Sequence, residues 1–166
     1  MKTCLALIIT SLLLVTAVTA EEVELAKAGS AAGTCGFTDT SQVLAQGKEY
    51  LHVNYDARGI VATDNKASPI YMASVQCVGA LKAIKGEFKE IGLCTYTRPD
   101  GDQIHGSYEG TGKLGVGVKG TMNWVGGTGK CEGITGSVEW TRTSLKGPAQ
   151  GIGASVSNFT YNWKLP

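Results

Sequence analysis

The sequence predicts an all-β protein, a closed antiparallel β-barrel of about eight strands. Apolar and polar residues alternate with a period of two over many short segments, as in strands with one buried face. The 166 residues include 23 glycines, four prolines and only 17% charged residues, which suits many turns in an ordered domain. Closure would remove the two exposed edges of such a meander. A two-sheet sandwich is the alternative.

The chain begins with a predicted secretory signal peptide, residues 1–20. A basic start is followed by the apolar run Leu5 to Val18, which is too short for a spanning helix. Val18-Thr19-Ala20 is an acceptable cleavage site. We therefore expect an exported protein with no lipid anchor and no stable membrane insertion after signal removal. An uncleaved anchor is the alternative.

One domain is expected after the signal, with a flexible leader at residues 21–34 and the barrel at residues 35–166. The formal net charge of the chain is +1, and no block of like charges appears. This pattern gives no support for a nucleic-acid-binding surface or for a polybasic membrane patch. No nucleic-acid partner is expected.

Turn signals divide the barrel into segments, of which Pro99-Asp100-Gly101-Asp102 is the strongest, because Asp-Gly there separates two alternating runs. Lys85-Gly86 and Ala57-Arg58-Gly59 are weaker turns. The expected strands are residues 48–56, 59–63, 70–81, 86–97, 103–110, 116–125, 134–140 and 152–165. Glycines inside these strands suit the sharp curvature of a small barrel, namely Gly79, Gly92, Gly106, Gly120 and Gly136.

Four cysteines follow the signal peptide, and two disulfides are expected in an oxidising compartment. Antiparallel pairing around Lys85-Gly86 places Cys77 roughly opposite Cys94, close enough for a disulfide. The remaining pair is then Cys35 with Cys131, which would join the N-terminal segment to a glycine-rich connection.

That connection lies within residues 124–140, which are predicted to be strand, glycine-rich turn and strand. It resembles part of a phosphate-binding loop, but a Walker loop needs a glycine at the position of Trp124 and a Ser or Thr at the position of Cys131. No helical pattern follows, so nucleotide binding is not expected. The glycines of this structural motif are Gly126, Gly127, Gly129, Gly133 and Gly136.

The glycine motif resembles the corresponding stretch of the allene oxide cyclase and dirigent proteins, and most closely their bacterial relatives, the allene-oxide-cyclase-barrel-like secreted proteins. Residues 92–102 are similar to the Gly-x-Cys…Asp-Gly-Asp hairpin of the same relatives. The resemblance implies a calycin-like barrel with a central cavity, export to the bacterial periplasm or beyond, and homo-oligomers. It implies no catalytic set, because the shared motif is structural glycine.

A hairpin around the Asp-Gly turn brings Tyr96 near His105, with Glu109 further along the return strand. If all three side chains point inward, they form an acid/base cluster at the barrel mouth. A shift of one residue turns the return strand to the other face, and an exposed His105 is the alternative. His52 with Asn54 is a second polar pair, expected on a solvated face.

Three aromatic residues are candidates for ligand contacts, Trp124, Trp140 and Tyr161, with barrel core as the alternative for each. No Ser-His-Asp order, paired-carboxylate motif or CxxC pair is found, so no metal site and no cofactor are expected. The favoured function is binding of a small apolar or aromatic molecule inside the barrel. The alternatives are a cyclase or isomerase enzyme and a structural protein with a filled barrel.

Overall fold

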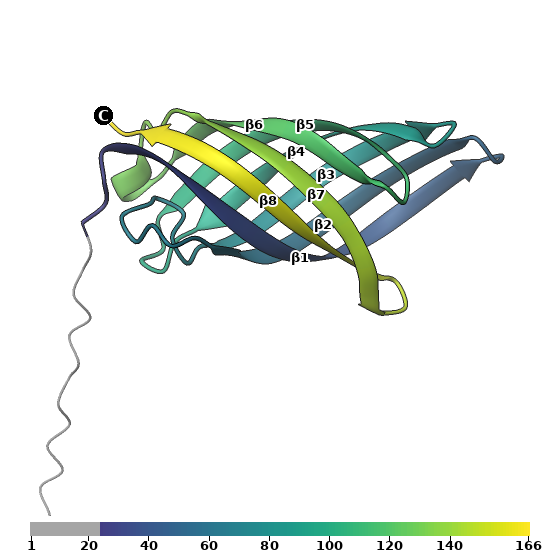
Figure 1. Cartoon of the computed structure of the whole chain (residues 1–166), viewed down its shortest axis with the longest axis horizontal. Coiled ribbons are helices and arrows are strands. Elements are labelled where there is room, and N and C mark those ends of the chain that lie inside the picture. Colours follow the sequence, from purple (N-terminus) through teal and green to yellow (C-terminus); the bar gives the residue numbers. More distant parts are fainter. Residues whose placement is uncertain (1–23) are drawn as a thin grey trace, which may run out of the picture.

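The computed structural model describes residues 24–166, so the predicted signal peptide and the start of the leader lie outside the described residues. The fold is a closed antiparallel barrel in which each strand pairs with the next and the last pairs with the first (Figure 1). The predicted all-β barrel is therefore confirmed. The strands are β1 (Ala28–Gln46), β2 (Tyr50–Ala62), β3 (Ser74–Ile84), β4 (Glu87–Thr97), β5 (Gln103–Lys113), β6 (Gly117–Gly127), β7 (Ser137–Ala149) and β8 (Ile152–Lys164).

Two of the predicted boundaries are wrong in the N-terminal part. Residues 28–34, expected in a flexible leader, form the first part of β1 and pair with β8. The turn expected at Ala57-Arg58-Gly59 does not exist, because Gly59 stays in the ladder, opposite Phe37 on one side and Val75 on the other. The two short segments predicted there are one continuous strand, β2, and residues 35–46, where no strand was predicted, form the rest of β1.

One end of the barrel, the closed end, is filled by apolar side chains. The connection between β2 and β3 and the short 3-10 helix η1 (Gly129–Cys131) lie at this end. No helix within residues 24–166 is long and apolar enough to cross a membrane. The buried side chains at this end include Ile70, Ile104, Ile134, Trp163 and Leu165.

The Asp-Gly-Asp turn fixes η1 to the β4–β5 hairpin at the closed end. Asp102 accepts a hydrogen bond from the backbone N–H of Lys130 at 2.8 Å. Asp100 pairs with Arg98 at 3.1 Å and with the Lys130 ammonium at 3.4 Å. Gly129 has a positive φ of 53°, and the Asp102 carboxylate occupies the space that a Cβ would need there. The Asp-Gly-Asp turn and the glycine-rich connection therefore contact and stabilise each other at the closed end.

The opposite end, the open end, is formed by the tips of four hairpins, which join β1 to β2, β3 to β4, β5 to β6 and β7 to β8 (Figure 1). The β3–β4 register places Cys77 directly opposite Cys94, and the two form a disulfide. This pairing confirms the prediction. Side chains of alternate residues point inward along every strand, which leaves a cavity between the closed and open ends.

Candidate functional site

The barrel interior contains a cavity of about 300 Å³. Its apolar lining includes Phe37, Leu81, Trp140 and Phe159, which come from four different strands. Serine side chains and Asp39 line the wall formed by β1, β7 and β8. Because Ser41, Ser144 and Leu145 line the cavity and are also exposed, the cavity opens at the open end. The barrel is not filled by its own side chains.

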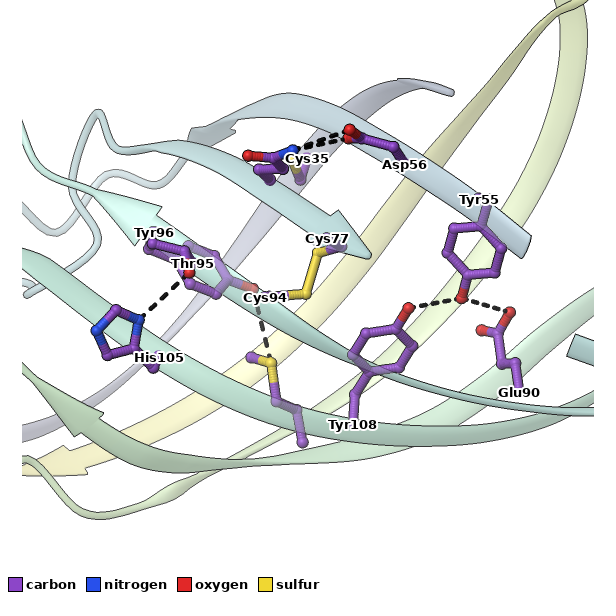
Figure 2. The surroundings of a disulfide bond; sticks show 12 residues. Cys35, Tyr55, Asp56, Cys77, Glu90, Cys94, Thr95, Tyr96, His105 and Tyr108 are labelled. Atoms are coloured by element: carbon purple, nitrogen blue, oxygen red, sulfur yellow. Dashed lines mark hydrogen bonds between the residues drawn. A yellow bond between two sulfur atoms is a disulfide. The ribbon is translucent and has the colours of Figure 1, made fainter. Parts of the chain in front are cut away.

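Four side chains form a hydrogen-bonded group in the wall of this cavity, which we call the interior polar cluster: Tyr55, Glu90, Tyr108 and Arg142. The hydroxyls of Tyr55 and Tyr108 are 2.6 Å apart, and Tyr55 donates to Glu90 Oε2 at 3.2 Å (Figure 2). Arg142 donates to the same Glu90 oxygen at 2.6 Å. Each hydroxyl has one hydrogen, and that of Tyr55 is donated to Glu90. The hydrogen bond between the two tyrosines is therefore donated by Tyr108.

Glu90 lies behind the other three side chains. Its side chain is 0% exposed, and that of its ion-pair partner Arg142 is 22% exposed. Within residues 24–166, Glu90 Oε1 has no hydrogen-bond partner. Tyr55, Tyr108 and Arg142 line the cavity. The carboxylate therefore orients the three groups that a ligand can touch.

Glycines on two neighbouring strands make room for the two tyrosine rings. The Tyr108 hydroxyl lies against Gly79 and Gly92, which face each other across β3 and β4. A Cβ at either position would overlap that hydroxyl. These glycines were predicted to allow strand curvature, and the structure adds a second reason for them, which is access for the tyrosines.

The environment of the cluster keeps both phenols protonated. Burial raises the pKa of Tyr108 to about 12. Burial, followed by the negative charge of Glu90, raises the pKa of Tyr55 further. For Arg142, burial has the largest effect and lowers the pKa, but the charge of Glu90 together with Tyr55 and the hydrogen bonds to both raises it more, so the net pKa is raised. The Arg142 guanidinium also lies over the Trp140 ring, 5.6 Å from its centroid.

Stability is expected to fall as the pH rises from about 10 to about 12. Tyrosine in an unfolded chain ionises near pH 10, whereas folded Tyr108 has a pKa of about 12. In this window the unfolded state has lost a proton that the folded state keeps, so a rising pH favours unfolding; below it, both states are protonated. Tyrosinate absorbance, measured against pH in native and in denatured protein, checks this difference in ionisation. The signal that appears near pH 12 in the native protein and is absent from Tyr108→Phe belongs to Tyr108. A Tyr108 signal at pH 10 in the native protein would contradict it.

The predicted acid/base cluster does not form. Tyr96 points inward and lines the cavity, where its hydroxyl contacts the Met122 sulfur at 3.9 Å. The register places Tyr96 opposite Ile104, so His105 and Glu109 lie on the outer face of β5. His105 there contacts the Thr95 hydroxyl at 3.3 Å (Figure 2). This is the alternative register that the sequence left open.

Of the three aromatic candidates, only Trp140 lines the cavity. Trp124 is core, and its indole N–H donates to the Asn162 carbonyl at 2.9 Å. Tyr161 is also core, and its hydroxyl lies 2.7 Å from that of Ser68. His52 and Asn54 contact each other at 3.2 Å on the exposed face, as expected.

The predicted disulfide between Cys35 and Cys131 is wrong, because both thiols are free. Cys35 points into the cavity from β1, whereas Cys131 belongs to η1 at the closed end. Burial raises the pKa of Cys35 to about 12 and also raises that of Cys131, which keeps both as unreactive thiols. No group of three or more histidine, cysteine, aspartate or glutamate residues in the described part of the chain could hold a metal ion.

The interior polar cluster was not among the predicted sites, although the sequence contains a signal for it. Glu90 shares its parity with Phe88 and Cys94, and Arg142 shares its parity with Val138 and Trp140. A charged residue on an otherwise apolar face is expected to be paired when it is buried. Two such positions on different strands, one acidic and one basic, indicate an interior ion pair.

No protein-family model and no curated protein sequence matches the chain. A solved structure, that of a pterocarpan synthase dirigent protein, is similar to it, with a TM-score of 0.52 and 13% sequence identity over 84% of this chain and 93% of the other. At this identity the likeness shows the fold alone. The fold is thus a dirigent-like barrel, in agreement with that part of the predicted resemblance.

Proposed function

We propose that this chain is an exported barrel protein that binds a small, neutral, apolar or aromatic molecule in its interior. The observation that carries the proposal is the open cavity of about 300 Å³, which has aromatic walls and the interior polar cluster. Cavities that are mostly apolar with a few placed polar groups are typical of small-molecule sites. Export, to the bacterial periplasm or beyond, is supported by the Cys77–Cys94 disulfide.

The polar cluster suggests what part of the ligand it recognises. Glu90 neutralises Arg142, so the pair offers no net charge to a ligand. The N–H groups of Arg142 that Glu90 leaves unused can donate to a carbonyl or phenol oxygen, and the Tyr108 oxygen, whose own hydrogen goes to Tyr55, can accept from a phenol O–H. We therefore propose a ligand with one such oxygen on an apolar body.

The test has two parts. Native mass spectrometry of the protein purified from its host is expected to show a retained small molecule that is lost on denaturation. Titration with phenylnaphthylamine, a neutral fluorescent probe, is expected to show binding that Ser157→Phe removes, because Ser157 lines the cavity. Asn158→Phe is the matched control, since Asn158 is the adjacent, exposed residue of β8. Equal probe binding by both variants would contradict the proposal, provided that both unfold cooperatively.

A cyclase or isomerase activity is the second candidate, and the hydrogen-bonded Tyr108–Tyr55–Glu90 chain favours it, because it can hold or move a proton at a ligand oxygen. The name of the similar structure, a synthase, points the same way. The recovered ligand should then be converted by the wild type and not by Tyr108→Phe, as followed by chromatography. Binding of the ligand without conversion by either protein would contradict the enzymatic activity and support the binding function alone.

A further inference from the structure

The four hairpin tips at the open end share a pattern that no single stretch of sequence shows. Each tip carries one lysine and at least one exposed apolar side chain. We call this set the lysine–apolar rim. Its lysines are Lys48, Lys85, Lys113 and Lys146, and its apolar residues, between 42% and 76% exposed, are Tyr50, Ile84, Leu114, Val116 and Leu145.

The two ends of the barrel differ in charge and in exposed apolar surface. The rim has two acidic residues, Glu49 and Glu87, of which Glu87 pairs with Lys113 at 3.2 Å. At the closed end the apolar side chains are mostly buried, and acidic and basic side chains of the connections and chain ends are equal in number. These charged residues are Lys27, Lys66, Arg98, Lys130, Lys164, Glu24, Asp64, Asp100, Asp102 and Glu132. Only the open end therefore combines an excess of basic residues with exposed apolar side chains at its tips.

The rim surrounds the mouth of the cavity. Leu145 belongs both to the rim and to the cavity lining. The neighbouring lining residues Ser41 and Ser144 are exposed at the same mouth. Whatever surface the rim contacts would thus face the entrance of the cavity.

We propose that the lysine–apolar rim docks the barrel on an anionic lipid bilayer, with the cavity mouth toward the lipid. The four hairpin tips are separate from one another (Figure 1), and each of them has at least one of the exposed apolar residues. A fluid interface can surround each tip separately. Lysine stems lie along apolar surface while their ammonium groups reach lipid phosphates. Such docking gives an apolar ligand a route between bilayer and cavity that avoids water; this last step rests on the proposed function, and the docking does not.

Co-sedimentation with vesicles tests the docking. Wild-type protein is expected to bind phosphatidylcholine vesicles that contain phosphatidylglycerol, and to bind pure phosphatidylcholine vesicles weakly. The tip variant Leu114→Ser/Val116→Ser/Leu145→Ser is expected to lose at least tenfold in partitioning, because these side chains supply the inserted apolar surface. The charge variant Lys48→Gln/Lys85→Gln/Lys146→Gln should lose about fivefold per lysine on anionic vesicles only.

The matched control is Val78→Ser/Ile91→Ser/Leu93→Ser, which removes exposed apolar side chains from the outer wall. It should partition like the wild type. All variants have the same N-terminal segment, so adsorption through residues 5–18 would be equal in all of them. Equal binding of the tip variant and the wild type, or an equal loss in the wall variant, overturns the docking. Phenylnaphthylamine uptake in solution by Leu114→Ser/Val116→Ser, which leaves the cavity lining unchanged, reports on the cavity separately.

Discussion

Replacement of Arg142 by leucine is expected to lower the free energy of unfolding by about 3–5 kcal/mol, the usual effect of removing one partner from a buried ion pair. The Glu90 carboxylate is 0% exposed and would keep only its hydrogen bond from Tyr55. A buried charge without a counter-charge is strongly unfavourable. Urea denaturation followed by circular dichroism measures the change.

Two further variants separate this effect from the loss of an arginine as such. Glu90→Leu/Arg142→Leu removes both charges and should recover most of the lost stability, since apolar replacement of a whole buried pair is often neutral. Arg58→Leu removes an exposed arginine that pairs with Asp56 at 3.2 Å, and it should leave the midpoint unchanged. A double variant as unstable as Arg142→Leu would show that lost packing, and not the unpaired charge, is the cause.

Removal of the Cys77–Cys94 disulfide by the double substitution to alanine is expected to cost about 3 kcal/mol, because the bond closes a loop with a sequence separation of 17 residues. The disulfide stabilises the protein by restricting the unfolded chain, so reduction of the wild type should lower the free energy of unfolding by nearly the same amount. Denaturation curves with and without reductant, with thiol titration to follow the bond, measure both.

Cys35→Ala is the control for this experiment. Cys35 is buried in the cavity wall but makes no disulfide. Its variant should therefore respond to reductant as the wild type does, whereas the Cys77→Ala/Cys94→Ala variant should not respond. An unchanged wild-type midpoint after the bond has been shown to open would contradict the expected stabilisation.

The central strands could be predicted from the sequence because their signals are local. In β3 to β6 most inward positions are apolar residues or glycines spaced two residues apart, and Lys85-Gly86 and Asp100-Gly101 are typical turn residues. Strand β1 has no such signal, because inward positions near its start are the small residues Gly29, Ala31 and Gly33. The rings of Trp163 and Phe159 on β8 cover two of these positions. A strand buried by the side chains of its neighbour shows no apolar pattern of its own.

The interior polar cluster was missed for a different reason. Its members lie on β2, β4, β5 and β7, and only Glu90 and Tyr108 come from neighbouring strands. Hairpin registers define which residues face each other within a ladder, but contacts across the interior depend on closure of the barrel. Tyr55 and Tyr108 also look like ordinary core aromatics, since each lies in an alternating run. The disulfide between Cys77 and Cys94 could be predicted because it depends on one hairpin.

Barrel closure also determines when the chain can finish folding. The β1–β8 ladder joins Ala28 to Lys164 and has the largest sequence separation of the strand pairings within residues 24–166. Each hairpin, β1–β2 included, can form as soon as its second strand leaves the ribosome or the export channel. The other edge of β1 must wait for β8, and closure is expected to be the slow step. Until then one edge of β1 has no partner. Its first residues are mostly glycine, alanine, serine and threonine, a composition with little tendency to form cross-β aggregates. The segment that waits longest for its partner thus has a composition that disfavours pairing with another chain.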